Sequence, residues 1–170
     1  EATPTAPDNA EATQVTLGNV TYWQMFGINE VTPNDEDIVI IEQLVLRRVE
    51  RDTPETGFPV IDLESALRAM FDSENVWMAE NVVIESIQIA DGMATIALTG
   101  EVSAVGGAIL TTVPLQIQLT VFEEPSINSF AMTLNGESIA NLGISHDSQA
   151  QTPDFIFTRE ALNQSLANMP

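Results

Sequence analysis

The sequence contains neither cysteine nor lysine, although it is 170 residues long. The absence of cysteine excludes disulfide bonds, catalysis by a thiol and zinc sites with cysteine ligands. It does not identify the compartment, because exported domains also fold without disulfides. A chain of this length forms one domain that buries roughly 70% of its unfolded surface, so a hydrophobic core alone can stabilise it.

Positive charge is scarce, because 25 acidic residues face only five arginines and the formal net charge is −20. The sequence therefore indicates no nucleic-acid partner, since it offers no cationic face for phosphates, and docking on anionic lipid is disfavoured for the same reason. Two explanations of the acidity stay open: adaptation to a salty habitat, or complementarity to a cationic partner. Three of the arginines form a cluster that we expect to pair with nearby carboxylates: Arg47, Arg48 and Arg51.

Long apolar runs are also missing. No stretch of 18 apolar residues is present, so we expect no membrane insertion by this segment. A chain that starts at Glu1 and not at methionine is expected to be a mature or trimmed form. Residues 1–14 hold only small, polar, acidic and proline residues, which predicts a disordered tether. Such a leader is typical of the segment that follows the lipid anchor of an exported lipoprotein, although other flexible tethers share its composition.

Histidine occurs once, at His146 in a polar loop, and this limits the catalytic and metal sites. Ser145 and Ser148 lie too close to it in sequence for triad geometry, and a zinc site needs several histidine or cysteine ligands. Gly106-Gly107 lacks the spacing and the lysine of a phosphate-binding loop, so we interpret it as a hinge. We therefore predict no catalytic residue, no cofactor site and no metal site, and the sequence leaves the partner-binding residues unknown.

Two acidic patterns could carry a function. Residues 34–37, NDED, could offer oxygens to calcium, but they lack the spacing of an EF-hand loop, so a solvated turn is favoured. A pair of carboxylates for glycoside hydrolysis stays open, because 25 acids allow many pairs.

The first half of the chain predicts two strands and one helix. Val15 to Phe26 is rich in strand-forming residues, and we expect Trp23 and Phe26 to be core residues and not a glycan-stacking platform. Residues 38–50 form a long apolar run, interpreted as a strand chiefly from 43 to 50. A helix is predicted for 62–72, with Asp62 as N-cap, Glu64 in the first turn and one apolar face: Leu63, Ala66, Leu67, Met70 and Phe71.

A hairpin is predicted next, because two alternating runs flank Asp91-Gly92, which favours a type I′ turn. The apolar positions of the two runs form one face, which the helix is expected to cover: Ile87, Ile89, Ala94, Ile96 and Leu98.

The run that follows, from Ala108 to Glu124, fits two templates. The apolar residues alternate as in a strand at Leu115, Ile117, Leu119 and Val121, whereas Leu110, Val113, Ile117 and Val121 have helical spacing. Pro114 suits the first turn of a helix that starts near Thr112 and would remove a ladder bond from a central strand. Periodicity alone leaves the two alternatives open.

Residues 116–137, QIQLTVFEEPSINSFAMTLNGE, resemble the closing pattern of GerM-type (GerMN, sporulation and spore germination) domains. The resemblance consists of Gln116 with Thr120 in a helical stretch, the acidic turn Glu123-Glu124-Pro125, and a strand, Phe130 to Leu134, that ends in Asn135-Gly136. The order of the preceding elements agrees, from the arginine-bearing strand at 44–51 through the helix to the hairpin, so that the match covers about 38–145. The resemblance favours helix for about 112–123.

The resemblance implies an α+β fold of two layers, with two main helices on one face of a mixed sheet. We expect one domain over 15–145, with its core at 38–145, and a C-terminal extension over 146–170. That extension has a short strand or packing anchor at Phe155 and Phe157, then a helix capped by Thr158 with one shared face: Ala161, Leu162, Ser165, Leu166 and Met169.

The resemblance also implies a function: a non-catalytic, extracytoplasmic interaction or assembly domain that binds a protein partner in the cell envelope, as part of an exported lipoprotein. Its terminal helix and its free sheet edges are candidate contact surfaces. The alternatives are a cell-wall glycan hydrolase with paired carboxylates and a module that binds calcium or a small molecule.

Overall fold

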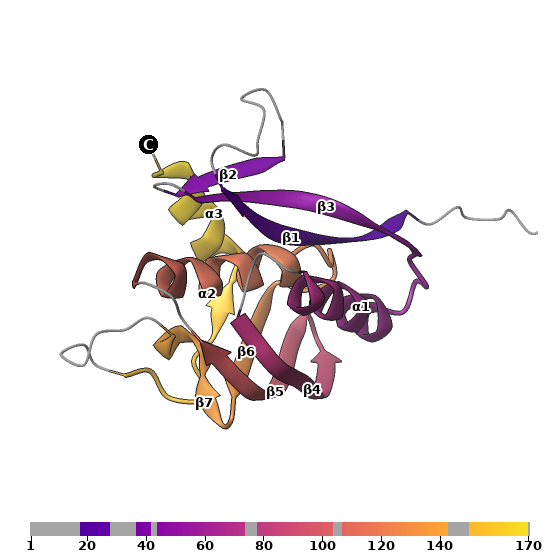
Figure 1. Cartoon of the computed structure of the whole chain (residues 1–170). Coiled ribbons are helices and arrows are strands. Elements are labelled where there is room, and N and C mark those ends of the chain that lie inside the picture. Colours follow the sequence, from indigo (N-terminus) through magenta and orange to yellow (C-terminus); the bar gives the residue numbers. More distant parts are fainter. Residues whose placement is uncertain are drawn as a thin grey trace, which may run out of the picture.

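A computed structural model describes residues 18–27, 37–41, 44–73, 78–103, 107–142 and 150–169. The tether predicted for 1–14 and the polar loop predicted around His146 lie outside the described residues. Along the chain (Figure 1), the elements are β1 Asn19–Gly27, β2 Ile38–Ile41, β3 Leu44–Pro54, α1 Pro59–Asp72, β4 Met78–Ala90, β5 Met93–Ser103, α2 Gly107–Val121, β6 Ser129–Leu134, β7 Glu137–Ser138, a 3₁₀ turn Ile139–Asn141, β8 Phe157–Thr158 and α3 Arg159–Ala167.

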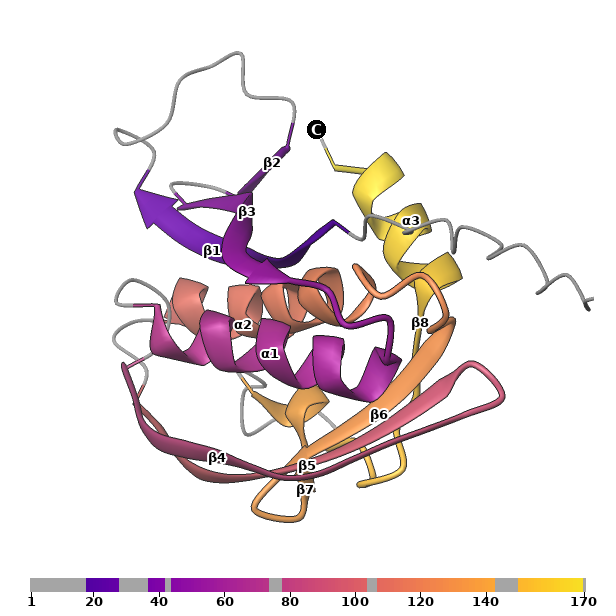
Figure 2. The ribbon, with the colours of Figure 1, turned by 90° about the vertical axis from the view of Figure 1, so that its right-hand side faces the viewer.

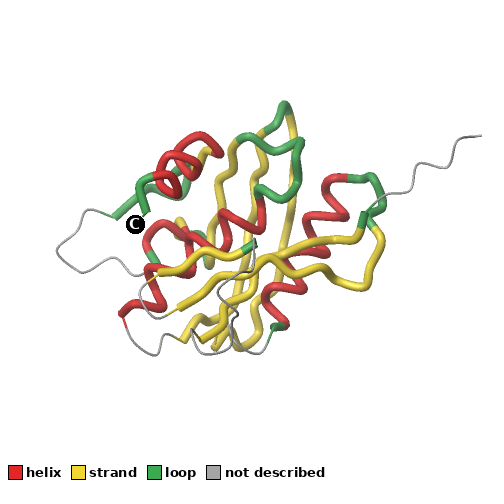
Figure 3. Tube along the Cα trace, turned by 90° about the horizontal axis from the view of Figure 1, so that it is seen from above, coloured by secondary structure: helices red, strands yellow, loops and turns green. Residues whose placement is uncertain are grey.

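The helices α1 and α2 lie side by side between two sheets (Figure 2). The lower sheet is mixed: β4 pairs antiparallel with β5, β5 pairs parallel with β6, and β6 pairs antiparallel with both β7 and β8. The upper sheet is antiparallel, with the order β1-β3-β2, and its strands cross above the helices (Figure 3). The α+β class, the mixed sheet under two main helices and the short C-terminal helix are confirmed. The upper sheet contains the strands that were predicted in the first half of the chain, but it forms a third layer where two were expected.

The core lies between the two helices and both sheets, and Met25 and Leu46 of the upper sheet are part of it. The inward residues of β5 and β6 are almost fully buried, as are the apolar residues that α1 and α2 direct at them: Ala94, Ile96, Leu98, Phe130, Met132, Leu63, Leu67, Met70, Ile117 and Val121. Burial of this apolar surface is the main source of stability.

Helix α2 confirms the helical alternative for about 112–123, although it begins earlier, at Gly107, and ends at Val121. Gly107 is therefore a helical residue and not a hinge, and Pro114 lies inside the helix and not in its first turn. Sheets or helices cover this helix on several sides, so consecutive residues from Leu115 to Ile117 are all buried. A helix that is buried on several sides carries no clear amphipathic period, which is why the two templates fitted equally well.

Helix α1 begins at Pro59, so the prediction of Asp62 as its N-cap was wrong. Proline at the first helical position already has the required φ angle, and this moves the start three residues upstream. Asp62 instead stabilises the preceding loop, because its carboxylate accepts hydrogen bonds from Thr56 N at 2.7 Å, Thr56 Oγ1 at 2.8 Å and Gly57 N at 3.0 Å. Glu64 consequently lies one turn further into the helix than expected.

Residues 38–50 form two strands, whereas we interpreted them as one. The strands β2 and β3 pair antiparallel, with Ile38 opposite Arg47 and Ile41 opposite Leu44. No glycine, proline or asparagine stands between them in the sequence, so no turn signal separated the two halves of the apolar run.

The predicted turn at Asp91-Gly92 is confirmed, and Asn135-Gly136, which ends the strand of the resemblance, is a turn of the same kind. Asp91 and Gly92 have φ angles of 51° and 76°, and Asn135 and Gly136 have 53° and 83°, as a type I′ turn requires at both central positions. The first turn joins β4 to β5, with Ile87 opposite Ile96 as the predicted common face demands.

The C-terminal segment packs onto the lower sheet. The predicted cap is confirmed, because the hydroxyl of Thr158 accepts a hydrogen bond from Ala161 N at 3.2 Å. Phe157 is part of the short strand β8, is buried, and stacks on Phe130 of β6 with ring centroids 4.9 Å apart. Ala161 and Ser165 of the predicted helix face are exposed, while Leu162 is buried. The domain boundaries at 14 and 145 stay a prediction.

Candidate functional site and exposed surfaces

Two polar side chains of α2 hold the main chain of β1 at Trp23. Gln116 Nε2 donates to Trp23 O at 2.6 Å, and Trp23 N donates to Thr120 Oγ1 at 3.1 Å. The N–H and C=O of one strand residue point to the same side, so these bonds occupy the edge of β1 that β3 leaves unpaired. Gln116 and Thr120 are fully buried and one helical turn apart, and we call them the main-chain clasp.

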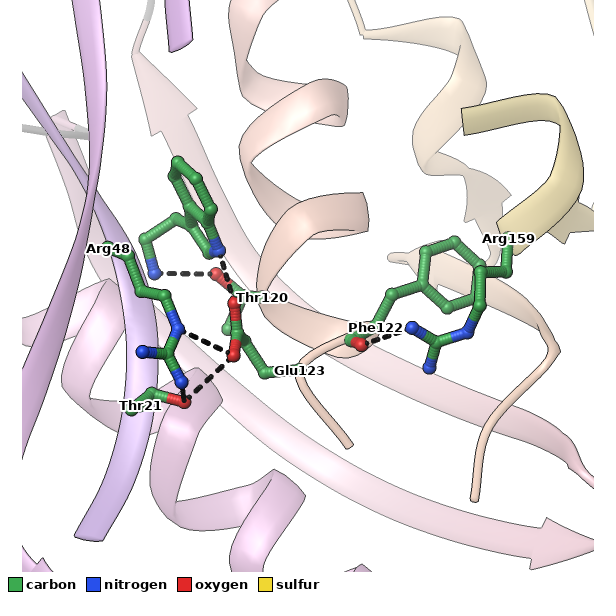
Figure 4. Close-up of polar contacts among 7 residues, drawn as sticks. Thr21, Arg48, Thr120, Phe122, Glu123 and Arg159 are labelled. Atoms are coloured by element: carbon green, nitrogen blue, oxygen red, sulfur yellow. Dashed lines mark hydrogen bonds and ion pairs between the residues drawn. The ribbon is translucent and has the colours of Figure 1, made fainter. Parts of the chain in front are cut away.

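A carboxylate at the end of α2 extends this contact into a polar cluster (Figure 4). Glu123 Oε1 accepts from the indole N–H of Trp23 at 2.7 Å, while Oε2 accepts from Arg48 Nε at 2.8 Å and from Thr21 Oγ1 at 3.1 Å. The four residues Thr21, Trp23, Arg48 and Glu123 form what we call the interlayer joint, since it ties the upper sheet to the helix layer.

The electrostatics of the joint suit a structural tie. Burial alone would lower the pKa of Arg48, but the hydrogen bond and the charge of Glu123 outweigh it and raise the pKa above its ordinary value. Both carboxylate oxygens of Glu123 accept hydrogen bonds from residues of the upper sheet. Glu123 therefore has the environment of a structural ion pair and not that of a catalytic base. The expected pairing of the arginine cluster is confirmed for Arg48, whereas Arg51 donates to a main-chain oxygen, Ser65 O, at 3.3 Å.

A small hollow adjoins the joint, between the end of β3 and the first turns of α1. It has a volume of about 20 Å³, and four carboxylates line it: Glu55, Asp62, Glu123 and Glu124. That volume admits one water-sized group and not a sugar ring. In the part of the chain that the structure describes, Glu123 is the one carboxylate of the four with an arginine at ion-pair distance.

A second joint is built on Arg159, the first residue of α3. Its guanidinium donates to Phe122 O at 2.7 Å, to Glu124 O at 2.9 Å and to Ile127 O at 2.7 Å. It also lies 5.0 Å from the centroid of the Phe122 ring (Figure 4). The positive charge satisfies carbonyl groups of the segment that follows α2, close to the C-terminus of that helix, where the helix dipole favours a cation.

The lower sheet has a second face, which points away from the helices (Figure 2). The residues paired across the centre of this face are uncharged, and the exposed Glu85 stands at the register shift of β4, between Ile84 and Ser86. Cross-strand pairs align outward residues in rows: Gln88 with Thr95 and Ala131, Ser86 with Ala97 and Thr133, and Val83 with Thr99. These eight residues are the outer face. A carboxylate returns at its border, where Glu101 follows Thr99 on β5.

Large apolar side chains are also exposed at the start of α1. Phe58 is 66% exposed, Ile61 is 51% exposed and Val60 is 37% exposed. We call these three residues the α1 tip. Since α1 packs on the inner side of the lower sheet, the tip and the outer face are separate surfaces.

The structure describes some of the residues that the sequence analysis singled out and leaves others outside the described ranges. His146, Ser145, Ser148, Gly106 and residues 34–36 lie outside the described residues, while Asp37 is described and its carbonyl accepts from Arg48 N at 3.0 Å. Trp23 is buried in the core as predicted, and Phe26 is half-buried. Within the described ranges, no group of three or more acidic, histidine or cysteine side chains is placed to hold a metal ion, and no helix is long and apolar enough to cross a membrane.

The comparisons with known proteins give a likeness of fold. No family model and no curated protein matches the chain. A candidate lipoprotein from Clostridium perfringens matches with a TM-score of 0.44 and 13% identity, over 84% of this chain and 89% of that one. The tandem GerMN domains of the sporulation protein GerM from Bacillus subtilis match with a TM-score of 0.39 and 19% identity, over 78% of this chain and 44% of that one. The second structure is of the family that residues 116–137 resemble.

Proposed function

We propose that the chain is a non-catalytic interaction and assembly module of the cell envelope, located outside the cytoplasm and held there by its N-terminal segment as part of an exported lipoprotein. The sequence of 116–137, which resembles GerM-type domains, and the tether-like composition of 1–14 support this proposal.

The observation that carries the proposal is the uncharged outer face. The chain has 25 acidic residues, yet none is among the eight paired positions of the outer face, and Glu85 stands beside them only where the register of β4 shifts. The centres of protein–protein interfaces are depleted of charged residues, because desolvating an unpaired charge is costly. The rows combine small apolar and hydroxyl side chains on a regular sheet, so a partner can approach closely and still satisfy the hydroxyl groups.

Site-specific photocrosslinking in living cells tests this role. A photoreactive residue at Thr95, in the centre of the outer face, is expected to yield a defined adduct with an envelope protein. The matched control is the same residue at Asp52, an exposed position on β3, which should give no such adduct. The chain is also expected to be digested by protease added to cells with permeabilised outer layers but an intact cytoplasmic membrane.

A hydrolase assay tests the alternative function, a glycan hydrolase. Purified chain incubated with cell-wall glycan is expected to release no soluble sugar. Release that disappears when one carboxylate is changed to its amide would contradict the proposal and support the glycan hydrolase alternative.

A further inference from the structure

The α1 tip is more apolar than folding requires. Phe58 occupies the N-cap of α1, where serine, threonine, aspartate and asparagine are preferred, and it makes no side-chain capping bond. With 66% of its surface exposed, it also contributes little to the core. Neither the helix nor the core explains a phenylalanine at this position, and Ile61 is exposed beside it.

The loop that presents the tip is held in one conformation. Asp62 accepts three hydrogen bonds from Thr56 and Gly57, and Thr56 Oγ1 accepts a further one from Phe58 N at 3.2 Å. Pro59 fixes its own φ angle at the first position of the helix. A contact surface that is already ordered loses little conformational entropy when it binds.

The surroundings of the tip are acidic. The hollow with its four carboxylates begins at Asp62, next to Ile61. The chain has no lysine, and each of its five arginines already makes a contact within the molecule. A second copy of the chain therefore has no spare cations with which to meet this surface, and an anionic lipid surface would be repelled.

We propose that the α1 tip docks into an apolar pocket of a protein partner whose rim carries lysine or arginine, with one of these side chains facing the acidic hollow. The inference rests on the proposed function in treating the chain as a protein-binding module, and it adds a second surface with a partner of defined chemistry. Complementary charge around an apolar anchor supplies orientation and association rate, while the anchor supplies affinity.

A displayed library of random peptides, selected on the full chain, tests the proposal. Enriched peptides are expected to combine large apolar residues with lysine or arginine. As synthetic peptides they should bind the double variant Phe58→Ser/Ile61→Ser at least about tenfold more weakly, as loss of hot-spot residues predicts. Ile156→Ser is the matched control, because Ile156 is 52% exposed, close to the 51% of Ile61, and lies outside both the α1 tip and the outer face; it should leave binding unchanged. Glu55→Gln should weaken binding several-fold at low salt.

Weaker peptide binding by the double variant would not be a consequence of unfolding. Serine is a better N-cap than phenylalanine, so the thermal midpoint of Phe58→Ser should not fall. Peptides that bind the double variant as well as the wild type, or that are acidic, would overturn the proposal. It would equally be overturned by tip-dependent binding to phosphatidylcholine vesicles or by tip-dependent self-association. The two proposals can fail separately. If the tip proposal is overturned but the crosslink at Thr95 forms, the proposed function stands. If no crosslink forms at Thr95 but basic peptides bind through the α1 tip, the tip proposal stands and the outer-face proposal fails.

Discussion

Glu123 makes more hydrogen bonds than any other side chain of the interlayer joint, since it accepts one from each of three residues of β1 and β3. It is largely buried, with 20% of its side chain exposed, so these bonds are partly shielded from water. A carboxylate can accept all of them at once, whereas an amide has one acceptor oxygen and an NH₂ group that would face donors.

We therefore expect Glu123→Gln to lower the free energy of unfolding by about 1–3 kcal/mol, the range for hydrogen bonds to charged groups. Urea denaturation measures the change. Glu55→Gln is the control, because Glu55 lines the same hollow but is exposed, and its effect should stay within about 0.5 kcal/mol. Equal stabilities of the two variants would show that the joint contributes nothing.

Tyr22 predicts an alkaline loss of stability. Burial raises the pKa of Tyr22 above its ordinary value of 10.0, and the positive charge of Arg51 offsets part of that rise. The unfolded chain then releases the proton at a lower pH than the folded chain, so stability is complete below about pH 10 and is lost as pH rises through the folded pKa. Tyr22 is the only tyrosine, so its absorbance gives the titration directly.

The matched variant is Tyr22→Phe, which should remove this part of the alkaline decline in the thermal midpoint. A tyrosinate absorbance that appears at or below the ordinary pKa would contradict the prediction.

Single residues were predictable from sequence where a local pattern fixes their role. Thr158 is a cap and Trp23 is a core residue, as their neighbours indicated. Arg159 was missed because its partners are carbonyl groups, which every residue has and no sequence pattern marks. The joint was missed because Thr21 and Glu123 are 102 positions apart.

Among the elements, the β8–α3 segment depends on one side chain for its docking to the end of α2. Arg159→Gln should lower the free energy of unfolding by about 1–3 kcal/mol, because several carbonyl groups would lose a charged donor. It should also speed amide exchange in 157–167 selectively, as expected for a segment that opens on its own.

Arg68→Gln is the control for this prediction. Arg68 pairs with Glu64 on the exposed face of α1, and such surface pairs contribute only about 0.3–0.5 kcal/mol. Exchange in 157–167 that is the same for both variants would show that Arg159 does not hold the segment.

The elements that the sequence predicted best are those with one buried face. The β4–β5 hairpin and α1 alternate or repeat clearly, because each contacts the core on a single side. Helix α2 was ambiguous by periodicity since it is buried between other elements, and the resemblance decided its type. The irregular pairing of β4, with register shifts between Glu80 and Val83 and between Ile84 and Ser86, has no counterpart in the sequence pattern.

For the whole molecule, the net charge of −20 predicts a dependence on salt. Like charges repel more strongly in the compact state than in the expanded one, and salt screens that repulsion. We expect the thermal midpoint to rise between about 0.05 and 1 M sodium chloride, over which the Debye length falls to about 3 Å.

The same rise is expected in Glu123→Gln, since one internal ion pair is a small part of the total charge. A midpoint that is flat or falls with salt would mean that attractive pairs dominate, and the acidity would then need an explanation other than tolerance of salt.

The α+β class followed from the sequence, but the stacking of three layers did not. The upper sheet requires β1 to pair with β3, although β2 lies between them in the sequence. Its position over α1 and α2 depends on contacts between distant residues. Patterns along a chain specify which face of an element is apolar, whereas they do not specify which other element will cover it.

The main-chain clasp has an evolutionary consequence. Gln116 and Thr120 grip the peptide groups on either side of one Cα atom, and peptide groups are the same whatever side chain stands there. Mutation can thus replace the indole at position 23 without releasing the grip, but inserting or deleting one residue in β1 would present the wrong peptide units to both side chains. These two hydrogen bonds therefore constrain the register of β1 and not the identity of the side chain at position 23.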